Sequence, residues 1–164
     1  MPEIIFDCCC ISNFALSDSL FILKNLTSES ALITNFVSAE IMRGIQKGHK
    51  DLAKITETLS EGWLREIDLK GKKEKALYQT LSMSLGLGEA SSIAMAKVRG
   101  FIFACDDRTA RREAGLLGVK LTGTLGLLKK ATRDKIVNLE ESDLILTRMK
   151  EKGFYSSVES LSEI

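Results

Sequence analysis

The sequence predicts an α/β fold in which a mainly parallel sheet is covered by helices on both faces. Short apolar segments of strand length alternate with helical segments along the whole chain, the order expected for a parallel sheet. Residues 101–105 (FIFAC) are apolar or small at every position, as in a strand buried on both faces. No internal repeat, low-complexity tract or linker interrupts the alternation, so we expect a single domain over residues 1–164.

The composition excludes several classes of protein. Of the 164 residues, 45% are hydrophobic and 27% are charged, which is ordinary for a globular domain and unlike a disordered or fibrous chain. The 23 basic and 22 acidic residues give a formal net charge of +1, so contact with nucleic acid must depend on local clusters of charge. Neither a membrane span nor a secretory signal is evident, so we expect no membrane association and a cytoplasmic location.

The cysteines do not form a recognisable framework. Cys8, Cys9 and Cys10 are consecutive and Cys105 is distant, a spacing that fits neither paired disulfides nor a structural zinc site. We interpret them mainly as small buried hydrophobic residues.

The first strand–helix unit places an acid at a strand end. Residues 3–6 (EIIF) predict a short strand that ends at Asp7. Residues 8–23 then predict one helix, because apolar residues recur in it at helical spacing. Residues 31–34 (ALIT) predict the second strand.

The second unit has a similar plan. Residues 37–48 predict an amphipathic helix that carries Glu40 in its first turns and has Ser38 as its candidate N-cap. Residues 51–59 predict a short helix, and residues 64–69 (LREIDL) alternate like a half-exposed strand.

Residues 76–100 predict two helices divided at Gly86 and Gly88. The second helix begins near Gly88 and holds Glu89 in its opening turn. Its expected packing face consists of small and apolar residues, namely Ile93, Ala94, Ala96 and Val98.

The buried strand at 101–105 ends in two acids, Asp106 and Asp107. The helix that follows places Arg108, Arg111 and Arg112 on one face. The remaining elements are a strand over 119–123, a helix over 124–136 opened by Thr122 or Thr124, and a C-terminal helical extension over 140–164. The sheet thus has four strands, or five with residues 64–69.

Acidic residues recur at the ends of strands and in the first turns of helices. They are Asp7, Glu40, Glu89, Asp106 and Asp107. In a doubly wound sheet with right-handed crossovers these places lie at a single end of the sheet, which we call the acidic edge. We therefore expect the carboxylates to converge there. Converging carboxylates either acquire raised pKa values or bind a hard cation, for which Mg²⁺ and Mn²⁺ are the best suited.

Each acid taken alone also has a structural explanation. Glu89 and Asp107 near helix starts favour the helix dipole, and Asp107 can cap the helix that follows it. Glu40 can lie on a solvated helix face. Asp7 is harder to explain in this way, because it directly follows a buried strand. For the five acids as a set, the sequence favours metal binding.

Two other doubly wound folds do not fit. A Rossmann dehydrogenase needs a glycine fingerprint at the first strand-to-helix turn, where this chain has DCCCIS. A phospho-receiver domain places its acidic pair after the first strand, whereas Asp106 and Asp107 follow a late one.

Five segments together carry a family resemblance. In chain order they are IIFDCCCISNF, VSAEIMRG, LGLGEASSIAMA, FACDDRTARREAGLLGV and TGTLGLLKKA, and they are spaced over roughly four fifths of the chain. With these segments the chain resembles a PIN domain, in particular the bacterial and archaeal group that includes the VapC-type toxin ribonucleases and their uncharacterised relatives.

The resemblance implies a three-layer α/β/α sandwich and a metal-dependent endoribonuclease that uses Mg²⁺ or Mn²⁺. The catalytic acids would correspond to Asp7, Glu40, Glu89 and Asp107, and the metal ligands to Asp7, Glu89, Asp106 and Asp107. Spacing does not decide between Asp106 and Asp107 as the primary ligand. Cys9 and Thr124 would be supporting residues. The family also implies an RNA substrate, a homodimer, and a small antitoxin protein as partner in a toxin–antitoxin pair.

Cys9 departs from the family pattern. Members often carry Ser or Thr two residues after the first Asp, and a thiol is a poorer hydrogen-bond partner than a hydroxyl. The alternative function is therefore a catalytically weak PIN-like module that binds RNA or a protein.

The basic residues near the acidic edge are candidates for contacts with RNA phosphates. They are Arg43, Arg108, Arg111 and Arg112. The aromatic residues Trp63, Tyr78 and Tyr155 form no stacking platform that is visible in the sequence, so the composition does not support sequence-specific recognition of single strands.

Overall fold

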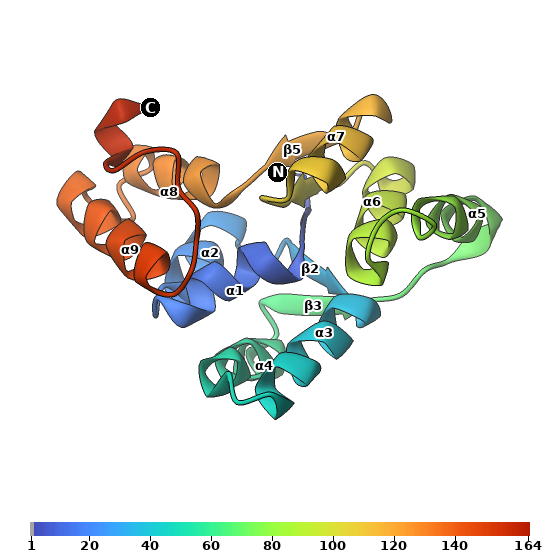
Figure 1. The fold of residues 1–164 in the computed structure, drawn as a ribbon, viewed down its shortest axis with the longest axis horizontal. Coiled ribbons are helices and arrows are strands. Elements are labelled where there is room, and N and C mark those ends of the chain that lie inside the picture. Colours follow the sequence, from blue (N-terminus) through green and yellow to red (C-terminus); the bar gives the residue numbers. More distant parts are fainter. Residues whose placement is uncertain (1) are drawn as a thin grey trace.

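The structure, a computed structural model, describes residues 2–164 and confirms the α/β class (Figure 1). Its strands form one parallel sheet in the order β3-β2-β1-β4-β5. The strands are β1 (Ile4–Phe6), β2 (Ala31–Thr34), β3 (Leu64–Ile67), β4 (Ile102–Ala104) and β5 (Lys120–Thr122). Within the half-exposed segment at 64–69, residues 64–67 thus form a true strand at one edge of the sheet.

Helices cover both faces of the sheet, as in a three-layer α/β/α sandwich (Figure 1). The helices are α1 (Cys8–Leu16), α2 (Leu20–Thr27), α3 (Asn35–Gln46), α4 (Ala53–Glu61), α5 (Gly71–Leu81), α6 (Leu87–Arg99), α7 (Arg108–Leu116), α8 (Thr124–Arg133) and α9 (Leu139–Glu151). Two 3₁₀ turns, η1 (Lys50–Leu52) and η2 (Leu161–Glu163), complete the described elements.

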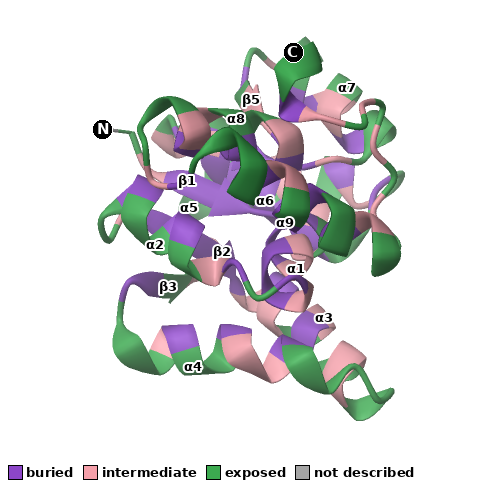
Figure 2. Cartoon of the chain, turned by 90° about the vertical axis from the view of Figure 1, so that its left-hand side faces the viewer, coloured by how far each residue is buried: buried purple, intermediate pink, exposed green. Residues whose placement is uncertain are grey.

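Alternation along the strands divides the core into two layers. In β1, Ile4 and Phe6 pack in a cluster with residues of α1, α2, α8 and α9, while Ile5 faces the other way. Ile5 and Phe103 pack instead with residues of α5, α6 and α7. Figure 2 shows the buried strands between helices that are buried on their inner side only. This two-sided burial explains why the inner strands β1 and β4 consist of apolar or small residues, whereas the edge strands β3 and β5 include charged ones.

The strand order reverses at β1. The chain runs from β1 outward to β2 and β3, then returns to place β4 on the opposite side of β1. Phe6 and Ala104 are in register, and the Asp7 amide donates a hydrogen bond of 2.9 Å to the Ala104 carbonyl. Asp7 and the pair Asp106/Asp107 therefore flank the switch point, where doubly wound sheets bind ligands.

Three expectations about helix boundaries were wrong. Residues 8–23 form two helices, since the chain turns between Ser17 and Ser19 with Asp18 at a φ of 56°. α3 starts earlier than expected, and its N-cap is Thr34, whose hydroxyl accepts from the Val37 amide. Ser38 lies inside this helix and its hydroxyl donates to Glu66.

Two further expectations need correction. Val98 is 44% exposed, so the packing face of α6 runs instead through Ser91, Ser92 and Met95 together with Ile93, Ala94 and Ala96. Residues 140–164 are helical only in part: after α9 the chain is extended or turned until η2. Within residues 2–164, no helix is long and apolar enough to cross a bilayer.

Candidate functional site

Asp7 lies at the centre of the acidic edge. It follows β1 directly, occupies the N-cap position of α1, and is only 3% exposed. Ligand atoms of Asp7, Glu89 and Cys105 all lie within 4.8 Å of one another. The Cys105 thiol is 3.8 Å from Asp7 Oδ2 and donates toward it. The structure thus brings together two of the predicted acids, and adds a cysteine.

The pKa of Asp7 shows how crowded this edge is. Burial, followed by the charges of Glu89 and Glu40, raises the pKa of Asp7 to about 7. Burial and the charges of Asp107 and Glu40 likewise raise the pKa of Glu89. Since these acids act on one another, Asp7, Glu40, Glu89 and Asp107 form one electrostatic group, as the sheet topology predicts.

Gly88 lets Glu40 approach the start of α6. The Gly88 amide donates to Glu40 Oε1 at 3.2 Å, and a Cβ atom at Gly88 would lie 2.7 Å from that oxygen. One residue further on, Glu89 Oε2 accepts from the Gly86 amide at 3.3 Å, closing the first turn of α6. The GLG sequence therefore has a packing role, because it lets two carboxylates share one helix terminus.

Asp106 is held by a separate network. Its Oδ1 accepts from the Thr124 amide at 2.9 Å, and its Oδ2 accepts from the Thr124 hydroxyl at 2.6 Å. The Asn13 amide also donates to Asp106 Oδ2, at 3.3 Å, and to the Thr124 hydroxyl, at 3.1 Å. Thr124 thus positions Asp106. The sequence pattern did not single out Asn13, although this residue lies in the first of the five segments that carry the family resemblance.

Asp107 differs from its neighbour. It is the N-cap of α7, where its Oδ1 accepts from the Ala110 amide at 2.9 Å, as the sequence predicted. Its charge also raises the pKa of Glu89, so Asp107 faces the Glu89 side of the edge. Asp106 instead contacts α1 and the start of α8. The two adjacent acids therefore serve different parts of the site.

The predicted RNA-contacting arginines lie in different surroundings. Arg111 Nη1 donates to the backbone carbonyls of Cys105, at 2.7 Å, and Thr122, at 2.8 Å, so it joins the ends of β4 and β5. Arg112 pairs with Glu113 at 3.3 Å. Arg43 and Arg108 are exposed. Arg111 therefore has a structural role that the sequence did not indicate.

The cysteines around Asp7 are neutral thiols at ordinary pH. Partial burial of the Cys9 thiol, together with the charges of Asp7 and Glu89, raises its pKa to about 11. Burial and the charge of Asp7 raise the pKa of the Cys105 thiol well above its usual range. Cys105 was interpreted as a buried hydrophobic residue. Its place next to Asp7 follows from the pairing of β1 with β4, which spacing alone does not reveal.

These residues fit a hard divalent cation. The Asp7 and Glu89 carboxylates supply oxygen atoms close to one another, and oxygen is the ligand that Mg²⁺ and Mn²⁺ prefer. Cys105 and Cys9 are protonated thiols here, which makes them poor ligands. The carboxylates would therefore hold the ion.

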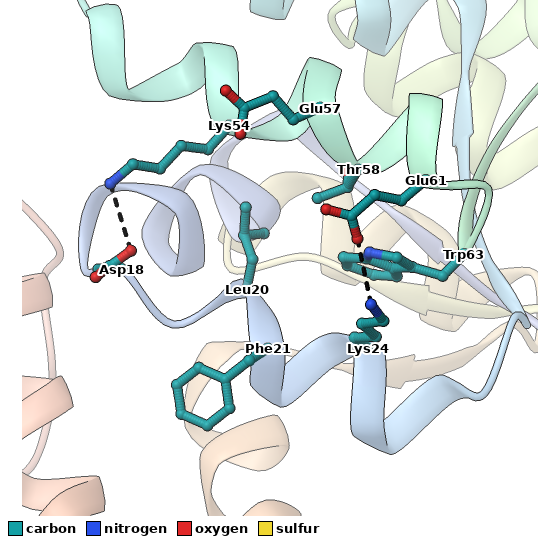
Figure 3. Close-up of a pocket in the computed structure, with 9 residues that line it drawn as sticks. All are labelled: Asp18, Leu20, Phe21, Lys24, Lys54, Glu57, Thr58, Glu61 and Trp63. Atoms are coloured by element: carbon teal, nitrogen blue, oxygen red, sulfur yellow. Dashed lines mark hydrogen bonds and ion pairs between the residues drawn. The ribbon is translucent and has the colours of Figure 1, made fainter.

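A second hollow, between α2 and α4, has a different character (Figure 3). Its charges are paired across it, with Lys24 3.3 Å from Glu61 and Lys54 3.4 Å from Asp18. Two of its three lining acids therefore have basic partners, unlike the acids that converge at the acidic edge.

Comparison with known proteins agrees with this architecture. A family model described as a PIN domain matches residues 3–164, nearly the whole chain. No curated protein matches the chain. PIN domains are generally nucleases, and the acidic edge at the switch point is consistent with a nuclease-type fold. From its sheet, its acids and this match, the chain belongs to the PIN domain family.

Proposed function

We propose that the protein is a metal-dependent endoribonuclease that hydrolyses RNA phosphodiesters at the acidic edge. The observation that carries the proposal is the convergence of Asp7 and Glu89, in a place where burial and neighbouring carboxylates raise the pKa of both. A divalent cation relieves this repulsion. When bound, such an ion supplies activation of a water molecule and stabilisation of the leaving oxygen.

The side chains of this chain divide the remaining work. Asp7 and Glu89 would hold Mg²⁺ or Mn²⁺. Glu40 is directed toward them by the Gly88 amide, and Asp107 adds negative charge on the Glu89 side. Asp106 is fixed by Thr124 and is the candidate auxiliary ligand. Exposed arginines, Arg108 above all, would neutralise RNA phosphates.

Incubation of the purified protein with RNA tests this proposal. We expect cleavage with Mn²⁺ or Mg²⁺ and none with EDTA. The Asp7→Asn variant keeps the volume and the acceptor oxygen of the side chain but loses its charge, so cleavage should fall by at least roughly 100-fold. Gel analysis of the RNA and circular dichroism of the variant are the measurements.

The control is Asp18→Asn, which alters an exposed acid on the other hollow and should cleave like the wild type. Cleavage that survives both EDTA and Asp7→Asn would contradict the proposal. RNA binding without metal-dependent products would instead identify the alternative, a binding module whose Cys9 thiol replaces a hydroxyl.

The toxin role, the antitoxin partner and the homodimer stay predictions, supported by the family resemblance. Light scattering of the purified protein measures the oligomer. Expression of the chain with and without Asp7→Asn measures toxicity: growth arrest that the variant abolishes would support a toxin, and unaffected growth with the wild type would count against it.

A further inference from the structure

A hollow lies directly beside the acidic edge and shares Asp106 and Arg108 with the proposed site. Asp106, Arg108 and Arg111 line one side of it, and Leu125, Phe154 and Tyr155 line another. Asp106 belongs both to this hollow and to the acidic edge. A ligand in the hollow would therefore lie next to the proposed cleavage site.

The charge of the hollow suits an anionic ligand. Two of its three charged lining residues are arginines, so the net charge of the lining is positive. Arg111 donates to backbone carbonyls, but Arg108 is exposed and makes no ion pair within residues 2–164. Arg108 is thus free to contact a phosphate at the mouth of the hollow.

Tyr155 gives the hollow an open aromatic face. It is 87% exposed and its hydroxyl makes no hydrogen bond within residues 2–164. Trp63 and Tyr78 are engaged elsewhere, since Trp63 is buried and Tyr78 stacks on Phe36 with ring centroids 5.0 Å apart. An aromatic side chain that has no internal partner and lines a hollow with a cation is suited to a nucleobase.

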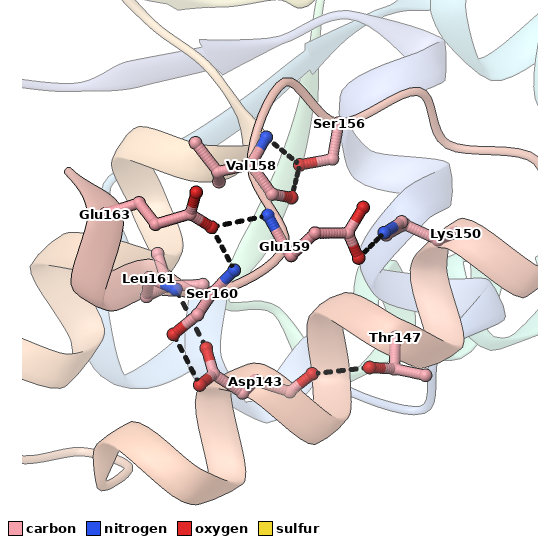
Figure 4. Close-up of polar contacts among 9 residues, drawn as sticks. All are labelled: Asp143, Thr147, Lys150, Ser156, Val158, Glu159, Ser160, Leu161 and Glu163. Carbon is pink, nitrogen blue, oxygen red and sulfur yellow. Dashed lines mark hydrogen bonds and ion pairs between the residues drawn. The ribbon is translucent and has the colours of Figure 1, made fainter.

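The segment that carries Tyr155 is held on both sides, and Figure 4 shows the contacts that follow it, from Ser156 to Glu163. Phe154, before it, packs against the core. After it, the Ser156 hydroxyl donates to the Val158 carbonyl at 2.7 Å, and Asp143 of α9 accepts from the Leu161 amide at 2.8 Å and from the Ser160 hydroxyl at 2.7 Å. A backbone segment that is already held in place loses less conformational entropy when a ligand binds.

We propose that this hollow binds one nucleotide of single-stranded RNA next to the phosphodiester that is cleaved, with the base stacked on Tyr155 and a phosphate contacted by Arg108. The identity of the ligand rests on the proposed nuclease function. Tyr155 is then a positioning residue for the substrate. Aromatic stacking accepts every base, so the hollow would place the strand without reading its sequence.

Binding can be measured separately from cleavage. The experiment uses the Asp7→Asn protein in EDTA and a short fluorescein-labelled single-stranded RNA, followed by anisotropy. Adding Tyr155→Ala should raise the Kd by about 5- to 150-fold, whereas Tyr155→Phe keeps the ring and should stay within about twofold. Arg108→Ala should weaken binding and reduce the salt slope by about 1.

Phe21→Ala is the matched control, because Phe21 is an exposed aromatic on the other hollow. It should bind RNA like its parent. The substitutions at Tyr155, Arg108 and Phe21 should leave the circular dichroism of the Asp7→Asn parent unchanged, since these three side chains are exposed.

The outcomes separate the two proposals. Equal affinity of Tyr155→Ala and Tyr155→Phe would overturn the assignment of the hollow, as would an equal loss with Phe21→Ala, and either result leaves metal-dependent cleavage standing. Absence of cleavage in the wild type would overturn the nuclease, while a Tyr155-dependent affinity would still support the hollow as an RNA site.

Discussion

Gly88 controls the position of Glu40. A Cβ atom there would lie 2.7 Å from Glu40 Oε1, so Gly88→Ala must push the carboxylate away from the acidic edge. Displacement by about 1 Å can cost roughly 100-fold in rate when a catalytic group depends on its placement. We expect cleavage by Gly88→Ala to fall by about that factor, measured as initial rate with Mn²⁺.

Gly86→Ala provides the comparison for this prediction. It is the same substitution two residues earlier, and its Cβ would meet Glu89 Oε2 at 3.8 Å, an ordinary contact. Both variants should remain folded by circular dichroism. If the two lose the same activity, the effect comes from α6 as a whole and the specific role of Gly88 is wrong.

Asp7 should make the metal-free protein less stable as the pH rises. Its folded pKa is about 7 and its ordinary value is 3.8, so the folded state holds the extra proton between these values. Stability therefore falls as the pH increases from about 4 to about 7, by up to about 4 kcal/mol. Asp7→Asn removes this loss, and in EDTA the variant should be more stable than the wild type at pH 8.

Urea denaturation at pH 4 and at pH 8 measures the difference. Glu89→Gln should also be more stable than the wild type at pH 8, by a smaller amount, because the pKa of the Glu89 carboxyl is raised as well. Saturating Mn²⁺ should reverse the order at pH 8, since the cation stabilises only the protein that binds it. If the unfolding free energy of the wild type, relative to that of Asp7→Asn, increased from pH 4 to pH 8 in EDTA, the expected repulsion would be contradicted.

The sequence predicted the acids at this edge better than it predicted their supports. Asp7 and Asp107 follow strands, so the hydrophobic pattern alone located them. The roles of Asn13 and Cys105 depend on contacts between residues more than 90 positions apart. Such contacts arise only when α1 and the ends of β1 and β4 come together, and no local pattern encodes that.

At the scale of elements, Arg111 joins two strand ends. Its guanidinium bonds the carbonyls of Cys105 and Thr122, so Arg111→Met would leave the Cys105 carbonyl without this partner. The expected cost is roughly 1–3 kcal/mol of unfolding free energy. Thermal denaturation should show a lower Tm for Arg111→Met and little change for Arg108→Met, whose side chain is exposed. Equal Tm values for Arg111→Met and Arg108→Met would show that the hydrogen bonds of Arg111 do not stabilise the two strand ends.

The order of the elements could be predicted, but several boundaries could not. Strand positions followed from apolar runs, and β2 occupies the predicted residues. The break between α1 and α2 was missed because apolar spacing continues across it, while Asp18 adopts the left-handed conformation. The start of α3 was missed because Thr34 is both the last residue of β2 and the N-cap of α3, so no loop separates the two elements.

At the scale of the whole molecule, the C-terminal segment closes one side of the core. Leu161 is 4% exposed and packs with the cluster between the sheet and α8/α9, although it is three residues from the chain end. Leu161→Ala should therefore cost about 2–5 kcal/mol. Leu144→Ala, on the exposed side of α9, should cost much less. Urea midpoints measure both, and similar midpoints would mean that the segment does not pack as described.

The end of the sheet opposite the acidic edge is a suitable place to attach a tag. Gly62, Gly100 and Gly118 make the turns that lead into β3, β4 and β5, each with a positive φ and with open space where a side chain would begin. Because all strands are parallel, these turns lie at the end remote from the acids. A peptide tag inserted at such a turn should be tolerated. It would anchor the protein to a sensor chip with the acids facing the flowing solution.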